Sequence, residues 1–284
     1  MTKINPKCTT ITGTRLRADE FVCTEVDSTV DGAHLRALLE GRGGPLLVRR
    51  FISPVACRTI ATRFVAATGA GQRTDDVQGR EVGVGHYGKT IDGYLDRVEA
   101  TCAEVEGLFD GTAHVPTMIA EALKRAVEPG VTVRPAMHGG RSAACVRASQ
   151  WQRAGKFILA PHDDKAQCSQ AAQRGFEIQE IDSPVSVVVY PSMPEQGGEL
   201  RLYNMAPDDQ TRTLLGISET GHPYPVELLD GIPYIDIRTE AGDALFANGS
   251  FLHAVRQCHG TIPRVSLTGF FGLNRRKDVV LLYT

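Results

Sequence analysis

The stretch GDALFANGSFLHAVRQCHGTIPRVSLTGFFG, residues 242–272, is a succession of short apolar runs separated by turn residues. Gly242-Asp243 and Asn248-Gly249 are typical turn pairs, and the second one predicts a tight hairpin between strands at 244–247 and 251–257. A third strand is expected over 264–271. No helical periodicity interrupts these runs, so this part of the chain is predicted to form antiparallel β-structure.

The same pattern continues on both sides of this stretch, from about Arg141 to the last residue. Further short strands are expected at 143–149, 156–160, 184–190, 199–203, 234–238 and 278–283. Many short strands with Gly and Pro turns and no helices between them are typical of an antiparallel double-sheet barrel or jelly roll.

The first half of the chain has a different pattern, because residues 28–130 mostly show the periodicity of amphipathic helices. A helix is expected at 53–69, with Ser53 as its N-cap, Pro54 in its first turn and Gly69 at its end. Val55, Ile60, Phe64 and Val65 are expected on its apolar face, and further helices at 90–109 and 116–130. A strand is predicted at 45–51.

Because no linker rich in Pro or Ser separates the two halves, a single domain is predicted over 1–284. In this α+β arrangement the mainly helical residues 1–140 support one face of a barrel that is formed by 141–284.

Composition excludes several classes of protein. Lys and Arg number 31 against 33 Asp and Glu, with no dense basic cluster, so no nucleic-acid partner is expected. The sequence contains no signal-peptide pattern and no run of 18 apolar residues, which predicts no membrane segment. Seven scattered cysteines without a Cys-x-x-Cys pair favour reduced thiols and a cytoplasmic protein.

The candidate site begins in FILAPHDDKAQ, residues 157–167, where a buried strand ends in His162, Asp163 and Asp164. A solvated turn would account for the aspartates. The alternative is that His162 and Asp164 are two ligands of a metal site, with the Asp163 side chain pointing away from the metal.

Three residues of the 242–272 stretch extend this candidate site. His253 lies in an expected strand, and Arg264 and Ser266 are two residues apart in the next one, so their side chains share a face. A buried arginine needs an anion, and a guanidinium with a hydroxyl suits a carboxylate. Two histidines and one carboxylate form the facial triad that binds Fe(II) in non-haem oxygenases.

On these residues the chain resembles the Fe(II)/2-oxoglutarate-dependent oxygenases, in particular those that hydroxylate N-substituted amino acids or halogenate alkaloids. The resemblance rests on PEQGGELRLYN (194–204), GDALFANGSFLHAV (242–255), PRVSLTGFF (263–271) and NRRKDVVLLYT (274–284). It implies a double-stranded β-helix of the jelly-roll or cupin-like kind. It also implies Fe(II), the co-substrates 2-oxoglutarate and O2, and ascorbate as an aid in assays.

The resemblance assigns roles to individual residues. His162, Asp164 and His253 would be the catalytic metal ligands, and Arg264 with Ser266 would bind the distal carboxylate of 2-oxoglutarate. Arg147 is a further candidate for binding 2-oxoglutarate or substrate. Halogenating relatives have a small residue where this chain has Asp164, so hydroxylation is expected here.

Other motifs have simpler explanations. GVGHYG, residues 83–88, fits a dinucleotide fingerprint but lacks the surrounding βαβ pattern, and it is interpreted as a flexible loop. His86, Tyr87 and Lys89 of this loop are candidates for substrate contact. His259 is expected at an exposed position, and Glu199 is given no catalytic role.

The substrate is expected to be a small molecule. Two long segments, 165–184 and 205–231, exceed the usual length of loops, and the first is predicted to be a lid over the metal. Arg153, Arg174 and Arg201 are the cations expected to favour an anionic N-acyl amino acid over a neutral alkaloid. The alternatives to an oxygenase are a cupin-like metal isomerase without 2-oxoglutarate and a catalytically silent binding protein. A homodimer is possible.

Overall fold

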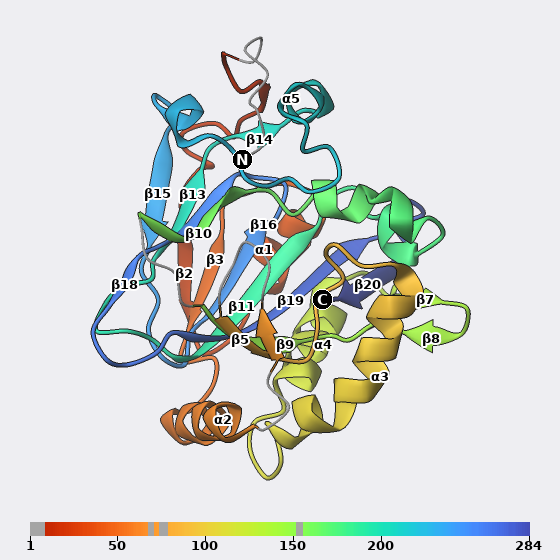
Figure 1. Cartoon of the computed structure of the whole chain (residues 1–284), viewed down its shortest axis with the longest axis vertical. Coiled ribbons are helices and arrows are strands. Elements are labelled where there is room, and N and C mark those ends of the chain that lie inside the picture. Colours follow the sequence, from red (N-terminus) through yellow and green to blue (C-terminus); the bar gives the residue numbers. More distant parts are fainter. Residues whose placement is uncertain (1–8, 68–70, 74–78, 152–155) are drawn as a thin grey trace.

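The computed structural model describes residues 9–67, 71–73, 79–151 and 156–284 (Figure 1). Within these residues the α-helices are α1 Gly32–Leu39, α2 Pro54–Ala66, α3 Ile91–Gly107, α4 Val115–Ala126 and α5 Asp209–Leu215. Short 3₁₀ helices are η1 Ala166–Ser169, η2 Ala171–Gln173, η3 Glu177–Glu180 and η4 Val226–Leu229.

A large sheet runs through the middle of the molecule. Its strands, in spatial order, are β2 Thr24–Asp27, β3 Leu46–Arg49, β16 Ala244–Asn248, β11 Val185–Ser192, β19 Val265–Leu273, β9 Arg147–Trp151, β5 Gly79–Val82 and β4 Gly71–Arg73. The second half of β19 pairs with β20 Val279–Tyr283, which pairs in turn with β6 Thr132–Pro135. Most pairs are antiparallel, but β2–β3 and β20–β6 are parallel.

A smaller sheet faces the large one. Its order is β10 Phe157–His162, β17 His253–Arg256, β13 Leu200–Tyr203 and β15 Tyr234–Ile237, all antiparallel. The remaining two-stranded pairs are β1 Gly13–Thr14 with β14 Ala206–Pro207, β12 Gln196–Gly197 with β18 Cys258–His259, and β7 Met137–His138 with β8 Arg141–Ser142. Apolar side chains of both sheets, such as Leu245 of β16 and Leu202 of β13, meet in one buried cluster.

Side chains along the strands of the large sheet point alternately to the helices and to a cavity. Val185, Val187 and Val189 of β11 point to the helices, where they join a core with residues of α1, α2 and α4. Ser186 and Val188 between them line a cavity on the opposite face. The period of two residues therefore gives this sheet a helix-covered face and a cavity face. Figure 1 shows α2, α3 and α4 together on one side of the molecule, as expected for helices that support the strands.

Helix α2 begins as predicted, because the Ser53 side chain accepts a hydrogen bond from the Ala56 amide and Pro54 is in the first turn. Only two of the four residues predicted on its apolar face are buried. Ile60 and Phe64 are fully buried, but Val55 and Val65 are 62% and 54% exposed. At about 100° per residue these two valines lie on the opposite side of the helix from Ile60. The expected final residue, Gly69, lies outside the described residues.

The nine strands expected in the C-terminal half are all present within a few residues of the predicted bounds. The prediction of a hairpin at Asn248-Gly249 is wrong. Strand β16 pairs with β3 and β11, whereas β17 pairs with β10 and β13, so the turn carries the chain from one sheet to the other. Gly249 is held there by two backbone hydrogen bonds, to Pro184 and from Asp164.

Among the described residues, none of the helices combines the length and the apolar character that a bilayer crossing requires. The six cysteines in this part of the chain are free thiols.

Candidate metal centre and cavity

The two sheets enclose a cavity of about 140 Å³. Its wall is apolar over Leu159, Val188, Leu200, Leu245 and Val255. The polar and aromatic part of the lining consists of Tyr87, Arg147, Trp151, His162, Asp164, Gln167, Ser186, Tyr190, His222, His253, Arg264, Ser266, Thr268 and Phe270. The residues predicted to bind the metal and the co-substrate, His162, Asp164, His253, Arg264, Ser266 and Arg147, therefore all line this one cavity.

His162 and His253 face each other across the small sheet. They are direct partners in the β10–β17 register, and their ring centroids are 4.1 Å apart. Each ring bonds through Nδ1 to the carbonyl oxygen two residues earlier, His162 to Ala160 and His253 to Phe251, both at 2.8 Å. A carbonyl can only accept, so Nδ1 carries the proton and Nε2 keeps a free lone pair for a metal.

Asp164 completes the group just beyond the end of β10. Its amide donates to the Gly249 carbonyl at 2.7 Å, which fixes the backbone. The carboxylate lies 3.8 Å from His162 Nε2 and 3.4 Å from His253 Nε2, and one ligand atom from each residue lies within 4.8 Å of the others. Asp164 Oδ2 is buried and accepts no hydrogen bond.

Burial governs the protonation of these groups. It lowers the pKa of His162 well below its usual range, and His253 and His222 act in the same direction. Burial also raises the pKa of Asp164 to about 6, against the effect of His253. A neutral imidazole is the form that ligates a metal, and a cation would compensate the buried carboxylate.

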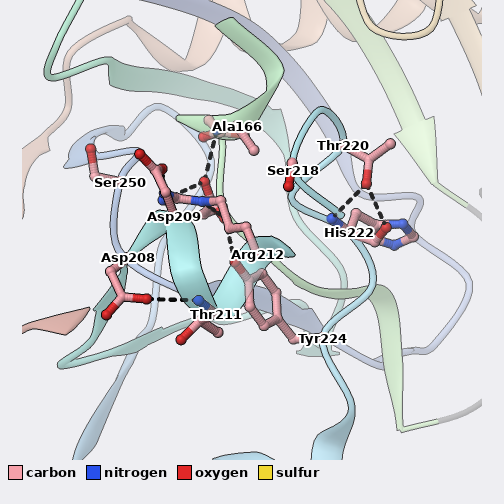
Figure 2. Close-up of polar contacts among 12 residues, drawn as sticks. Ala166, Asp208, Asp209, Thr211, Arg212, Ser218, Thr220, His222, Tyr224 and Ser250 are labelled. Atoms are coloured by element: carbon pink, nitrogen blue, oxygen red, sulfur yellow. Dashed lines mark hydrogen bonds and ion pairs between the residues drawn. The ribbon is translucent and has the colours of Figure 1, made fainter. Parts of the chain in front are cut away.

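The Asp163 side chain points away from the metal ligands, as predicted, and has a partner that the sequence did not reveal. Arg212 of α5 contacts both of its carboxylate oxygens at 3.2 Å, and the Tyr224 hydroxyl donates to it at 2.7 Å. The Ala166 amide donates to Asp163 Oδ1 at 2.9 Å. Figure 2 shows Arg212, Tyr224 and Ala166 close together. The contacts of Arg212 and Tyr224 with Asp163 tie the ligand segment to the 205–231 segment.

Arg264 and Ser266 lie at another part of the cavity wall, and both are almost completely buried. The Arg264 guanidinium lies 5.1 Å from the ring centroid of Tyr190, and its Nε has no hydrogen-bond partner. Within the described residues no carboxylate lies within ion-pair distance of Arg264. A buried guanidinium without a protein anion fits the binding of an anionic ligand.

The GVGHYG segment packs against the 165–184 segment. Gln173 of η2 bonds to the His86 ring at 2.9 Å and to the carbonyls of His86 and Lys89. His86 is only 2% exposed and does not line the cavity, so its predicted contact with substrate is wrong. Tyr87 does line the cavity. The predicted lid residues 165–184 form η1, η2 and η3, and Gln167 of this segment lines the cavity.

The arginines expected to attract an anionic substrate are elsewhere. Arg201 forms two 2.7 Å bonds with Asp236 and does not line the cavity. Arg174 is exposed, also away from the cavity lining, and Arg153 lies outside the described residues. His259 is exposed, as predicted.

Tyr190 and His222 are cavity residues that were not singled out from the sequence. Tyr190 could have been found, because it continues the alternation of Ser186 and Val188 along β11. His222 could not, since it lies in an irregular segment that is held by tertiary contacts, such as the hydrogen bond from the Asp163 amide to the Gly221 carbonyl.

Comparison with known proteins agrees with this arrangement. The model of the family described as "Carrier-protein-independent halogenase WelO5" matches residues 22–284. An L-isoleucine 3(1)-dioxygenase of Pantoea ananatis is 30% identical over 246 residues, which cover 82% of this chain and 81% of the relative.

Solved structures show the same fold at low identity. Two crystal structures of an N-substituted L-amino acid dioxygenase from Burkholderia ambifaria AMMD cover 89% of this chain and 91% of their own. One, a complex with alpha-KG, has a TM-score of 0.50 at 13% identity, and the other 0.53 at 14%. From the extent of the family match and from the dioxygenase relative, the chain belongs to the WelO5 family of Fe(II)/2-oxoglutarate-dependent oxygenases.

Proposed function

We propose that this protein hydroxylates an unactivated C–H bond of an amino acid, with Fe(II), 2-oxoglutarate and O2. The observation that carries the proposal is the cluster of two Nε2 atoms and one buried carboxylate, whose Oδ2 accepts no hydrogen bond, in one cavity. The dioxygenase relative, whose name specifies L-isoleucine, supports an amino acid as the substrate. In this proposal the two facing sheets are the double-stranded β-helix of a single oxygenase domain.

His162, Asp164 and His253 are proposed to hold the iron. The donor set fits Fe(II), because two neutral imidazoles and a carboxylate leave half of an octahedral coordination sphere open. The bound iron supplies the oxidising chemistry, in which substrate, 2-oxoglutarate and O2 give hydroxylated product, succinate and CO2. The carbonyls of Ala160 and Phe251 orient the imidazoles for this role.

Arg264 and Ser266 are proposed to bind the distal carboxylate of 2-oxoglutarate. Both face the cavity, and Arg264 has no carboxylate partner in the described part of the chain. A guanidinium fork forms paired charge-assisted bonds with a carboxylate. The apolar wall around Val188, Leu245 and Val255 would exclude water from the reacting groups.

Hydroxylation is favoured over halogenation by Asp164. Three protein ligands would leave the iron no position for chloride once both co-substrates are bound. An alkaloid substrate and a cupin-like isomerase without 2-oxoglutarate are the alternatives. A cytoplasmic location and a homodimer stay predictions.

The test is turnover of the purified protein with Fe(II), 2-oxoglutarate and ascorbate under air. Succinate and oxidised product would be measured for L-isoleucine, other aliphatic amino acids, N-acyl amino acids and a neutral alkaloid. We expect succinate formation coupled to a product heavier by one oxygen with an amino acid. Coupled turnover of the alkaloid alone would contradict the amino acid proposal, and isomerisation without succinate would contradict the oxygenase.

A further inference from the structure

The cavity has two ends, which are separated along one strand of the large sheet. Arg264, Ser266, Thr268 and Phe270 line the cavity at every second position, at the start of β19 and along it. At about 3.3 Å per residue, the Cα atoms of Arg264 and Phe270 are roughly 20 Å apart. Arg264 marks the end at which the distal carboxylate of 2-oxoglutarate is proposed to bind, and Phe270 marks the opposite end.

The metal ligand Asp164 lies at the Phe270 end. In the strand register Phe270 is opposite Ser186 of β11, and Ser186 is opposite Ala247 of β16. The Asp164 amide donates to the carbonyl of Gly249, two residues after Ala247, and a Cβ on Gly249 would lie only 2.9 Å from Asp164 Oδ2. If 2-oxoglutarate extends from the metal towards the guanidinium, the row Ala247, Ser186 and Phe270 remains for the substrate.

Gln167 reaches the cavity from the segment that follows the metal ligands. It lies in η1, three residues after Asp164, and its neighbours Ala166 and Cys168 are almost completely buried. The Ala166 amide donates to Asp163 Oδ1 at 2.9 Å, which ties the start of η1 to the ligand segment. Gln167 itself is half-buried and lines the cavity. Its direction is therefore fixed by neighbours that are packed away from the cavity.

Tyr283 connects Gln167 to Phe270. The Tyr283 ring stacks on the Phe270 ring, with centroids 5.4 Å apart and an angle of 26° between the planes. The Tyr283 hydroxyl lies 3.2 Å from Sγ of Cys168, the residue after Gln167. Tyr283 and Cys168 are both almost completely buried. The cavity thus has a carboxamide and an aromatic ring that are held in place by the same buried side chain.

The Gln167 carboxamide is a neutral group with both a donor and an acceptor. Within the described residues this side chain forms no hydrogen bond. The head group of an α-amino acid carries a donor, the ammonium, and an acceptor, the carboxylate, on one carbon, so the two groups are complementary. A neutral amide also leaves no buried charge without a partner when the substrate is absent.

We propose that Gln167 binds the head group of the amino acid substrate, with Nε2 donating to the carboxylate and Oε1 accepting from the ammonium, while the Phe270 ring contacts the substrate side chain. This inference rests on the proposed function and assigns residues that recognise its substrate. An aliphatic side chain fits best, because none of the side chains in the row Ala247, Ser186 and Phe270 is ionisable.

Binding can be measured without turnover by calorimetric titration of the protein with Fe(II) and 2-oxoglutarate under nitrogen. The ligands are L-isoleucine, 3-methylpentanoate, which lacks the ammonium, 2-methylbutylamine, which lacks the carboxylate, and L-alanine. The variants are Gln167→Met and Phe270→Leu, with Gln210→Met at an exposed position of α5 as the matched control. The affinity for 2-oxoglutarate is measured separately for each protein.

We expect Gln167→Met to weaken L-isoleucine binding roughly ten- to a hundredfold, the effect of one lost hydrogen bond to a charged group, with 2-oxoglutarate affinity unchanged. The effect should be smaller for 3-methylpentanoate and for 2-methylbutylamine, because each lacks one of the groups that Gln167 binds, so the losses are not additive. Phe270→Leu should weaken the binding of L-isoleucine more than that of L-alanine. Gln210→Met should bind all ligands like the wild type.

The isosteric variant Gln167→Glu provides a second test if Gln167→Met does not fold. It keeps an acceptor and loses the donor, so it should bind 3-methylpentanoate more weakly than the wild type does and 2-methylbutylamine at least as well. Weaker binding of the amine in this variant would contradict the proposed contact with the ammonium.

Unchanged L-isoleucine binding in Gln167→Met, or equal losses for L-isoleucine and the two ligands that lack one group, would overturn the role of Gln167. A loss confined to 2-oxoglutarate affinity would also overturn it and assign Gln167 to the co-substrate, as would a wild type that binds 2-oxoglutarate but not L-isoleucine. Failure of the proposed function is a different result: no 2-oxoglutarate binding by the wild type and no succinate formation with any substrate.

Discussion

Arg212 of α5 contacts both carboxylate oxygens of Asp163, with Nε 3.2 Å from Oδ2 and Nη2 3.2 Å from Oδ1. Asp163 stands between His162 and Asp164, so this ion pair joins the metal-ligand segment to a helix 49 residues further along the chain. Asp163 is fully buried and the Arg212 side chain is 6% exposed. The position of the two ligands thus depends on a residue that does not itself face the metal.

Breaking this pair should destabilise the fold. Asp163→Asn keeps the shape but leaves the Arg212 charge buried without its main partner, which typically costs about 3–5 kcal/mol. Urea unfolding in the presence of EDTA measures the change in the free energy of unfolding without a contribution from metal. Asp209→Asn is the control, because Asp209 also contacts Arg212 but is fully exposed, and it should change stability little. Equal effects of the two substitutions would contradict the role of the buried pair.

Arg264→Lys should raise the KM for 2-oxoglutarate. Lysine keeps the charge but loses the planar fork, and one lost charge-assisted bond corresponds to roughly a ten- to hundredfold weaker interaction. Succinate formation at varied 2-oxoglutarate measures the KM, and the KM for the amino acid should stay the same. Arg256→Lys, on the exposed side of β17, is the matched control. An unchanged KM for 2-oxoglutarate in Arg264→Lys would remove this residue from the co-substrate site.

Asp164→Gly should abolish hydroxylation and open a position at the iron for chloride. The substitution removes the carboxylate that lies between the two Nε2 atoms. Mass spectrometry of reactions with and without chloride separates hydroxylated from chlorinated product. Chlorination further requires that the substrate is held away from the hydroxylation path, so the yield of chlorinated product is a second readout. Full hydroxylase activity in the variant would show that Asp164 is not a ligand.

His86 should make stability depend on pH. Burial lowers its pKa to about 4, so the folded protein keeps it neutral while the unfolded chain protonates it near 6.5. Its contribution to stability is present above pH 6.5 and is lost as the pH falls from 6.5 towards 4. Between pH 7 and pH 5 this loss amounts to about 2 kcal/mol. In His86→Gln, metal-free urea unfolding should therefore lose less stability over this range than the wild type, and an identical loss in both proteins would contradict the assignment.

The features that depend on local sequence patterns were the ones best predicted from the sequence. Strands β11, β16, β19 and β20 could be located from apolar runs between Gly and Pro turns, and α2 from Ser53 and Pro54. His162, Asp164 and His253 could be proposed together because each lies in or next to an expected strand, where side-chain direction follows a period of two.

Features that depend on contacts between distant segments could not be predicted in this way. The Asn248-Gly249 pair has the composition of a hairpin, but hydrogen bonds to Pro184 and Asp164 direct the chain into the other sheet. In the same way the GVGHYG glycines fit a dinucleotide fingerprint by composition, yet their neighbour is Arg147 on another strand. Such partners are determined by the tertiary structure, and a local motif does not specify them.

The central claim is that His162, Asp164 and His253 hold a single Fe(II). Its most direct test is the iron content of wild type, His253→Ala and His259→Ala after anaerobic loading and gel filtration, with circular dichroism to verify folding. His259 is an exposed histidine six residues after His253 and serves as the matched control. We predict one iron per chain in the wild type and in His259→Ala, and almost none in folded His253→Ala. One iron per chain in folded His253→Ala would contradict the claim.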